Sequence, residues 1–415
     1  MIGPVKNHRH EQVTVSIDEL VPHDHFLRTV DALIDFSFIE RIASPYYCPD
    51  NGRPAIPSIT LFKMIFIGYF YGVRSERQLE KEIRDNIAYR WFLGYSLVDR
   101  IPDHSTISFN RKGRFEDTSV FEEIFDETVR QAKAHGMVSG RVLLSDSTHI
   151  KANANKNKFI RKAKAEKVVS YLGELEEAVV ADREAHGKKR KPKVIRPVAK
   201  TKPAMTRESV TDPDSGFLMR NQKPQGFFYL DHRTVEAVAL DAGYFTGHIC
   251  KTLNEAGTFV VMGYRRFKGG NPKVPKRLFT YVPSLDAYAC PMGCKLSYAT
   301  TDREGYRQYK SRPEDCEHCP LRSDCFSAKS KQRSIFRHIW EDEKEKVRAN
   351  KRTPSGKKLY KLRSQTIERS FADAKELHSF RYARRRGRKS VQEQAYLTAA
   401  VQNIKKMTLL LSRRV

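Results

Sequence analysis

Over about the first 130 residues, apolar side chains recur at the spacing of helices. They predict a helix over residues 26–34 and another that starts at residues 57–58 and is apolar around most of its circumference, as a buried core helix is. A capping-box pattern at Ser75 precedes an apolar residue in every fourth position, which predicts one stripe: Leu79, Ile83, Ile87 and Trp91. A further helix should start within residues 102–106. We therefore expect an all-helical module in this part of the chain.

Two apolar runs later in the chain each end at an aspartate. Residues 142–144 lead to Asp146 and residues 237–240 lead to Asp241, so both runs predict buried strands with a carboxylate at one end. A third carboxylate, Glu368, lies in a segment with a helical pattern. Such a set suits Mg²⁺, or two ions about 4 Å apart that clamp a phosphoryl group. Taken singly, each residue is more often a turn residue, a helix cap or part of a solvated face.

The rest of the pattern predicts further strands and helices. Strands are expected over residues 226–235 and 256–266, and an amphipathic helix over residues 391–411. A charged helix is expected over residues 161–185, and a basic linker follows at 188–193. Such a linker is usually solvated, and in a DNA enzyme it also adds affinity for phosphate.

The net charge of the chain limits the classes of molecule that it is expected to bind. The chain carries 76 Lys and Arg residues against 49 Asp and Glu residues, a formal net charge of +27. This excess implies a polyanionic partner, most simply nucleic acid. An anionic membrane is the competing partner, but no apolar run is long enough to span a bilayer, and the first residues lack a secretory signal pattern. We therefore expect a cytoplasmic, nucleoid-associated protein with no membrane partner.

Five of the seven cysteines cluster late in the chain, which fits a metal site or reduced thiols better than a disulfide framework. Two close pairs offer a tetrahedral Zn²⁺ set, with one more cysteine or a histidine as an extra or substitute ligand: Cys290 and Cys294, Cys316 and Cys319, then Cys325 and His318. The alternative is a set of reduced, half-buried thiols, and the clustering favours the metal. Cys48 and Cys250 are interpreted as packing residues.

Basic residues gather in two places that suit DNA phosphates. The last helix of the helical module carries Arg111 and Arg114, and such a module can dock in a groove or on phosphates. A packing domain with solvated arginines explains these two residues equally well. A second cluster follows so closely on Glu368 that we favour phosphate binding over a solvated face: Arg381, Arg384, Arg385, Arg386, Arg388 and Lys389.

Taken together, these features resemble a bacterial insertion-sequence transposase of the DDE type, over nearly the whole chain. The motifs that carry the resemblance are specific only in combination: Pro102-Asp103-His104-Ser105-Thr106, Leu144-Ser145-Asp146-Ser147-Thr148, Leu240-Asp241-Ala242-Gly243-Tyr244, Gly263-Tyr264-Arg265-Arg266 and Tyr360-x2-Arg363-x4-Glu368-x6-Lys375. The last is similar to the family's Tyr-Arg-Glu-Lys signature, with one extra residue between the Arg and the Glu.

The resemblance implies an α/β fold with an RNase H-like catalytic core, a mixed sheet with helices. The core would occupy residues 136–415, behind a helical DNA-binding domain at residues 1–135. Two insertions would interrupt the core: the charged helix and basic linker at 160–205, and the cysteine cluster at 268–335.

The resemblance also implies a site and its partners. Asp146, Asp241 and Glu368 would bind Mg²⁺ or Mn²⁺. Lys375, together with Tyr360 and Arg363, would hold DNA near the cleaved phosphate. The partners would be double-stranded DNA, both the terminal inverted repeats and the target, and further copies of the chain assembled on that DNA.

One departure from the family pattern concerns activity. The family has a further strand and helix where Val235 here runs directly into Glu236, so we suspect an internal deletion that leaves the sheet incomplete. The chain is then an active DDE transposase, a defective copy that survives as a non-catalytic inverted-repeat binder, or a metal-dependent nuclease of the same fold without strand transfer.

Overall fold

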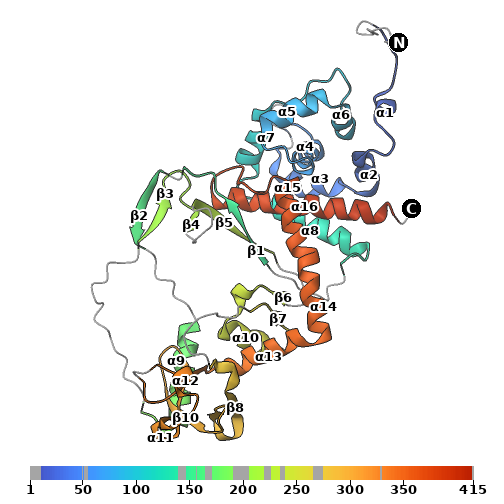
Figure 1. Cartoon of the computed structure of the whole chain (residues 1–415). Helices are drawn as coiled ribbons and strands as arrows, with labels where there is room; N and C mark the ends of the chain where they lie inside the picture. The colour runs from blue at the N-terminus through green and yellow to red at the C-terminus, as the bar shows by residue number, and fades with distance from the viewer. Residues whose placement is uncertain are drawn as a thin grey trace, which may run out of the picture.

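The computed structural model shows an elongated molecule in which a helical domain, a small sheet and a cysteine-bearing module follow one another (Figure 1). The residues that it describes are 11–48, 50, 55–138, 146–155, 157–163, 171–189, 205–218, 226–233, 239–264, 274–327 and 330–413. The strand predicted over residues 142–144, most of the basic linker and the suspected junction at Val235 and Glu236 lie outside these ranges.

The N-terminal part is helical, as the periodicity predicts. Its core helix α4 is buried around most of its circumference, in a cluster of aliphatic and aromatic side chains. The helices are α1 (Ile17–Leu20), α2 (Phe26–Leu33), α3 (Ser37–Ala43), α4 (Ser58–Phe70), α5 (Glu76–Asp85), α6 (Ile87–Leu93), α7 (His104–Phe109), a π-helical turn (Asn110–Arg114) and α8 (Val120–Ala134).

The predicted apolar stripe does not run through α5 and α6, and this prediction is wrong. Asn86 adopts an extended backbone and caps α6 with its side chain, so the chain changes direction there. Leu79 and Ile83 are buried, but Ile87 is 37% exposed. An asparagine side chain that bonds the backbone competes with helix continuation, and four-residue spacing alone does not register that competition.

The C-terminal helix α16 (Arg388–Leu411) confirms the helix predicted at the end of the chain and joins two parts of the molecule. Leu397, Val401 and Ile404 belong to the core of the N-terminal helices. Val391, at the other end of α16, belongs to the cluster beneath the small sheet. The helical domain and the rest of the chain therefore share one helix.

The described strands of the middle region form three separate groups. An antiparallel sheet has the order β1-β5-β4, with Asp146 opposite Arg233 and Lys151 opposite Phe228. A two-stranded antiparallel ribbon pairs β2 with β3, and a parallel pair joins β6 to β7. Their bounds are β1 (Asp146–Lys151), β2 (Phe159–Ala163), β3 (Met205–Ser209), β4 (Gly216–Leu218), β5 (Gly226–Arg233), β6 (Ala239–Leu240) and β7 (Val261–Met262).

The predicted charged helix is shorter than expected. Residues 159–163 pair as strand β2, and the helix α9 covers Tyr171–Ala185, where Leu175 and Val179 form its buried side. The strand predicted over residues 256–266 is reduced to Val261–Met262 within the described residues. Helix α10 (Gly247–Glu255) connects the parallel strands β6 and β7, as a parallel crossover requires.

The cysteine-bearing module is a five-stranded antiparallel sheet in the order β12-β11-β10-β9-β8. Helix α9 docks against it: the carboxylate of Asp182 accepts hydrogen bonds from Arg307 Nε (2.7 Å) and Thr301 Oγ1 (2.6 Å). The two segments expected to be separate insertions thus form one unit. Its other elements are β8 (Thr280–Val282), β9 (Ala287–Ala289), β10 (Lys295–Thr301), β11 (Tyr306–Lys310), α11 (Pro313–Glu317), α12 (Arg322–Cys325) and β12 (Ser334–His338).

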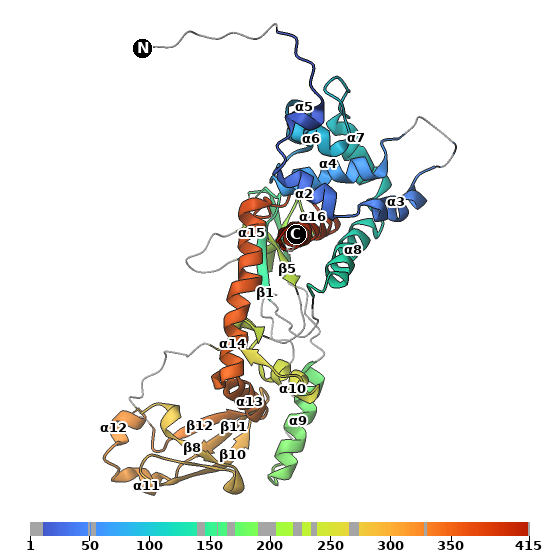
Figure 2. The same cartoon turned by 90° about the vertical axis from the view of Figure 1, so that its right-hand side faces the viewer.

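A helical column connects this module to the body of the protein. Figure 2 shows it rising from the module toward the helical domain. It consists of α13 (Glu341–Arg352), α14 (Pro354–Arg363), a π-helical turn (Ser364–Glu368) and α15 (Arg369–Leu377). Within the described parts of the chain, no helix is both long enough and apolar enough to cross a membrane.

Candidate active site

Asp241 stands at the end of a strand, as predicted, and that strand is paired in parallel with β7. It follows β6 directly, and its side chain is 47% exposed. The parallel pair β6 and β7 with α10 forms a βαβ unit, and in open α/β sheets the ends of such strands are where ligands bind. The fold therefore presents this carboxylate to solvent at a place suited to chemistry.

The carboxylates of Glu368 and Asp241 both lie near the guanidinium group of Arg363. Arg363 Nη2 lies 2.6 Å from Glu368 Oε1 and 3.9 Å from Asp241 Oδ1. The Arg363 side chain is 7% exposed, whereas both carboxylates are about half exposed, at 46% and 47%. Two of the three predicted metal ligands therefore converge around one buried cation and face solvent together.

The extra residue in the Tyr-Arg-Glu-Lys signature is absorbed by the π-helical turn Ser364–Glu368. In a regular α-helix, two residues five positions apart point about 140° away from each other. A π-turn has a wider i to i+5 repeat, which returns Glu368 to the side of Arg363. The turn keeps the signature on one face despite its altered spacing.

Tyr360, on α14, packs against Gly263, which follows strand β7. A Cβ atom at Gly263 would lie 2.6 Å from Tyr360 Oη and 3.0 Å from the backbone nitrogen of Ala242, so the close approach requires glycine here. Lys351 Nζ lies 3.8 Å from the centre of the Tyr360 ring. Burial lowers the pKa of Lys351, and the positive charge of Arg363 lowers it further.

Lys351 lies beside the candidate site, and the sequence patterns did not single it out. It lies in a strongly charged helix, where a lysine is usually solvated, and no spacing motif marks it. Its position beside Tyr360 and Arg363 becomes visible only when α13 and α14 fold against each other. Lys351 and Arg363, which both lie against the Tyr360 ring, make the surroundings of the two carboxylates cationic, which suits an anionic substrate.

Asp146 begins strand β1, and its side chain lies outside the described part of the structure. Both strand groups nevertheless contact the same helical column. Ala239 of β6 forms a buried cluster with Ile367 and Phe371, and Ile150 of β1 shares a buried cluster with Ala374. The strand that begins at Asp146 and the strand that leads to Asp241 are therefore both positioned against the helices that carry Glu368.

The free edge of β1 receives another segment. The backbone N–H of Lys151 donates to Arg381 O (3.1 Å), and the N–H of Ala383 donates to Lys151 O (2.8 Å). Residues 381–383 thus extend the sheet at its end, in parallel orientation. The hydrogen bonds described for β6 join it to β7 and not to β1.

Three arginines predicted to contact DNA lie in the interface between the helical domain and α16. Arg111 is 6% exposed and pairs with Glu76 (3.0 Å) and Glu393. Arg385 pairs with the same Glu393, and burial lowers its pKa to about 10. Arg384 lies 3.9 Å from the centre of the Tyr69 ring. Because Arg111 is buried and Arg384 and Arg385 are only partly exposed, each against a partner, we do not carry their DNA contacts forward.

The other predicted DNA contacts are more accessible. Arg381 is half exposed and pairs with Glu376. Arg386 is exposed, and its Nε donates to Asn153 O (2.9 Å). Arg114 packs over the Tyr47 ring at 3.9 Å. Lys375 is half-buried on α15, and burial lowers its pKa. The basic cluster after Glu368 thus divides into an interface half and an exposed half.

The five clustered cysteines line one small cavity of about 30 Å³ at one end of the module: Cys290, Cys294, Cys316, Cys319 and Cys325. All are free thiols. Burial and neighbouring thiols raise the pKa of Cys294 and of Cys325. His318 is exposed and is not among the lining residues.

Of the two remaining cysteines, Cys250 is buried, as expected of a packing residue, but Cys48 is exposed, so that interpretation is wrong for Cys48.

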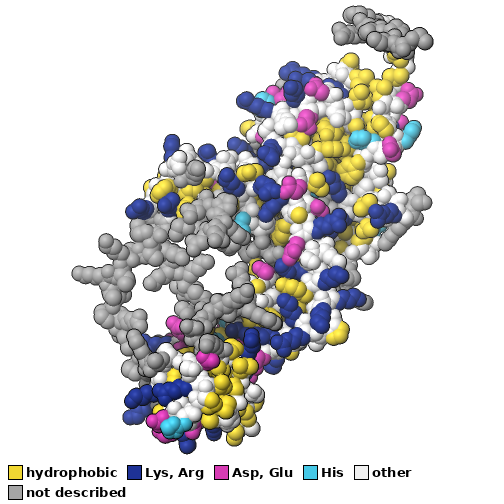
Figure 3. All heavy atoms as spheres, viewed as in Figure 1, with side chains coloured by type: hydrophobic (Ala, Val, Ile, Leu, Met, Phe, Trp, Pro, Cys, Tyr) yellow, Lys and Arg dark blue, Asp and Glu magenta, His cyan; other side chains and the backbone are white. Residues whose placement is uncertain are grey.

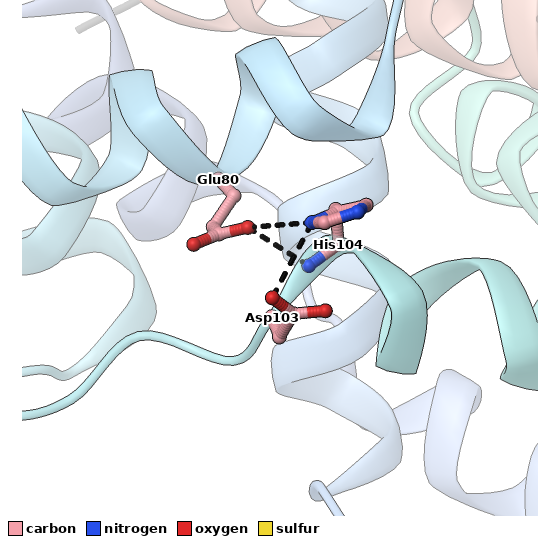
Figure 4. A group of neighbouring side chains, drawn as sticks. All are labelled: Glu80, Asp103 and His104. Carbon is pink, nitrogen blue, oxygen red and sulfur yellow. Dashed lines mark hydrogen bonds and ion pairs between the residues drawn. The ribbon is translucent and has the colours of Figure 1, made fainter.

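A second acidic group lies in the helical domain, between α5 and α7 (Figure 4). Among the described residues, Glu80, Asp103 and His104 are the one trio of acidic, histidine or cysteine side chains whose ligand atoms lie within 4.8 Å of one another. Glu80 Oε2 accepts hydrogen bonds from the backbone N–H (3.0 Å) and from Nδ1–H (2.9 Å) of His104. These bonds lower the pKa of Glu80.

The remaining atoms of this group also have partners. Asp103 caps α7 by accepting from Ser105 N–H (2.7 Å), and His104 Nε2 accepts from Arg77 Nε (3.1 Å). The group is a capping network that fastens α7 to α5, and it gives a structural reason for the motif that begins at Pro102.

The fold and the site together define an α/β protein with an acidic, cation-flanked site behind a helical domain. Residues 15–113 match the family described as Transposase domain (DUF772), and residues 289–408 match the family described as Transposase DDE domain. These two matches support a DDE-type insertion-sequence transposase, a mobile-element protein. No curated protein and no solved structure matches the chain. The second match includes Glu368, and both aspartates lie outside it.

Proposed function

We propose that the chain binds the terminal inverted repeats of its insertion sequence and catalyses metal-dependent cleavage and strand transfer of DNA within an RNase H-like core. The observation that carries this proposal is the convergence of Asp241 and Glu368 on Arg363. A β-strand end and a helix more than a hundred residues later supply two carboxylates to one solvent-facing point. Ordinary surface ion pairs do not need such an arrangement.

The residues fit a divalent metal. Their oxygens are the hard ligands that Mg²⁺ or Mn²⁺ prefers, and their half exposure leaves room for water and a phosphate. Asp241 and Glu368, with Asp146 as the third member, would hold the metal. When bound, it would neutralise charge on the phosphodiester and lower the pKa of an attacking water. Arg363 offsets part of the negative charge of the two carboxylates, mainly that of Glu368.

The chain's own residues would position the DNA. Lys351, Tyr360 and Arg363 border the carboxylates, and Lys375 and Arg381 continue along the helical column toward the sheet. Figure 3 shows Lys and Arg side chains gathered over α13 and α14 on the visible face. The exposed lysines among them are Lys346, Lys357, Lys358 and Lys361. Contacts to phosphate from such side chains fix the position of a duplex without reading its sequence.

A second candidate function is inverted-repeat binding without catalysis. It is favoured by the separation of β1 from β6 among the described strands, because a complete core of this kind joins the two aspartate strands in one sheet. The suspected deletion between Val235 and Glu236 would remove the strand and helix that complete that sheet. In this case the helical domain and the exposed basic residues would still hold DNA.

The experiment uses labelled DNA that carries the ends flanking this gene. Purified protein is incubated with it in Mg²⁺ or Mn²⁺, beside Asp146→Ala, Asp241→Ala and Glu368→Ala. Asp373→Ala is the matched control, because Asp373 is a similarly exposed carboxylate on α15. The proposal predicts cutting at the ends and joining to target DNA, lost in the first three variants and kept in the fourth. Specific binding without cutting would support the second candidate, and cutting without joining would indicate a nuclease.

A further inference from the structure

We propose that the cysteine-bearing module holds one structural Zn²⁺ through the thiolates of Cys290, Cys316, Cys319 and Cys325. The structure brings together residues from the β9–β10 turn, from α11 and from α12, and all of them line the same cavity. Such a convergence of free thiols is the main evidence for a metal. Soft thiolate ligands select zinc over the hard cations that suit the carboxylate site.

The first ligand is prepared by a tight turn. The backbone N–H of Cys290 donates to Cys294 O (2.9 Å), and Gly293 has a φ of +82°, which closes the turn between β9 and β10. The N–H of Cys294 then donates to the sulfur of Cys290 (3.2 Å). A backbone donor aimed at a sulfur atom stabilises its thiolate form, which is the form that binds metal.

The other ligands come from two short helices. Cys316 lies in the last turn of α11, Cys319 follows it in a hydrogen-bonded turn, and Cys325 ends α12. Cys316 Sγ lies 3.1 Å from Ser311 Oγ, which already accepts from Arg333 N–H (3.0 Å). The hydroxyl hydrogen of Ser311 is therefore available for the sulfur. Hydrogen bonds of this kind orient metal ligands from outside.

The fifth cysteine is assigned a supporting role. Cys290 and Cys325 both pack against the module's buried apolar cluster, and Cys294 is not among the residues that do so. Cys294 contributes its backbone N–H to Cys290 and needs no bond to the metal.

A metal would also meet a structural need. The strands of the module are three to seven residues long, and its buried apolar cluster is small. Small modules of this kind often depend on a metal or a disulfide. None of the sulfur atoms belongs to a described trio within 4.8 Å, so binding would draw the thiols inward to bond lengths of about 2.3 Å.

The module bears on the rest of the chain through Arg337. Its side chain is 1% exposed and reaches Glu345 (2.7 Å) and Asp342 (2.6 Å) on α13. Helix α13 leads into α14 and to Arg363. The metal would therefore fix the base of the helical column, independently of whether the carboxylate site is active.

The test measures zinc in the full-length chain, purified without chelator, by elemental analysis. We expect about one zinc per chain in the wild type and in Cys294→Ser, and none in Cys316→Ser or Cys325→Ser. Cys48→Ser is the matched control, because Cys48 is exposed and distant in sequence from the cluster. Retention of zinc by Cys325→Ser together with its loss from Cys294→Ser would overturn the ligand assignment.

A second measurement uses the wild-type chain, so its result does not depend on whether a cysteine variant folds. Cobalt replaces zinc in this chain, and the visible spectrum of the bound cobalt reports a tetrahedral thiolate site. Absence of bound metal, together with seven titratable thiols after denaturation, would refute the site, as would fewer than seven thiols, which would indicate disulfides. Because metal content is read without DNA, a transposase that is inactive but binds zinc separates this inference from the proposed function.

Discussion

Two arginine–carboxylate clusters of the molecule contain the same chemical groups but differ in how far their carboxylates are exposed to solvent. At Glu393, both the carboxylate (7% exposed) and Arg111 (6%) are buried between the helical domain and α16. At Glu368, Arg363 is equally buried, but the carboxylates are about half exposed. A cluster buried on both sides can only hold parts together. A cluster whose carboxylates face solvent can exchange its internal cation for a ligand.

The largest expected effect is the difference in stability between variants of these two clusters. Glu393→Gln leaves Arg111 and Arg385 without their shared charge in the interior, and we expect a loss of about 3–5 kcal/mol in the free energy of unfolding. Glu368→Gln should cost less, because its carboxylate is half exposed and Asp241 still lies 3.9 Å from Arg363. Urea unfolding of both variants measures the difference. Similar costs for the two would refute the contrast.

The same interface should respond to acid through His378. This residue is 1% exposed, its Nδ1 lies 2.7 Å from Tyr69 O, and burial lowers its pKa to about 4 from an ordinary 6.5. Above pH 6.5 the ring is neutral in both the folded and the unfolded chain. Between pH 6.5 and 4 the unfolded chain binds the proton first, so stability falls as the pH falls, by about 3 kcal/mol in all.

Urea midpoints between pH 7 and pH 4.5 measure this loss. His378→Asn serves as the control, since it removes the titrating group and should flatten the dependence in this window. An unchanged pH dependence in that variant would show that another group is responsible.

Packing beneath the solvent-facing cluster can be tested at a glycine. Gly263→Ala places a methyl group 2.6 Å from Tyr360 Oη, and we expect a cost of about 1–3 kcal/mol together with weaker binding of Mn²⁺. Gly243→Ala is the matched control, because its nearest neighbour, Asp241 Oδ2, lies at an ordinary 3.9 Å. Thermal unfolding and Mn²⁺ titration compare the two. Equal tolerance of both changes would contradict the close packing.

The smallest effect is expected from shortening the π-turn. Deleting the exposed Gln365 leaves Arg363 and Glu368 four positions apart, which a regular α-helix places on one face. The free energy of unfolding should change by less than about 1 kcal/mol, and metal binding should persist. Deleting the exposed Lys358 instead rotates the signature away from Gly263 and should be more damaging. The opposite order would show that the π-turn does not absorb the extra residue.

Several elements were predicted correctly because the information for them is local. The buried helix α4, the cap at Ser75 and the start of α7 follow from short patterns. The strand end at Asp241 and the helix around Glu368 were also predicted, and they are the parts of the site that the structure brings together. These predictions depend on a few neighbouring residues, whose backbone preferences act without the rest of the fold.

Local patterns do not show which basic side chains have partners elsewhere in the fold. Arg111 was predicted either to contact DNA or to belong to a packing domain, and the cluster after Glu368 was predicted to bind phosphate. In the structure Arg111 pairs with Glu393, 282 residues later, Arg385 pairs with the same carboxylate, and Arg384 faces Tyr69. Charge can be counted in a sequence, but burial and counter-charge cannot.

The sequence by itself therefore determined the helical character of the first domain, and it predicted a polyanionic partner and three candidate carboxylates. Only the tertiary structure decided which basic side chains remain exposed, that α9 joins the cysteine-bearing module, and that a π-turn and Arg363 hold Glu368 beside Asp241. The physical reason is that periodicity and capping are properties of neighbouring residues. Burial and ion pairing, by contrast, depend on contacts that exist only after distant segments have packed.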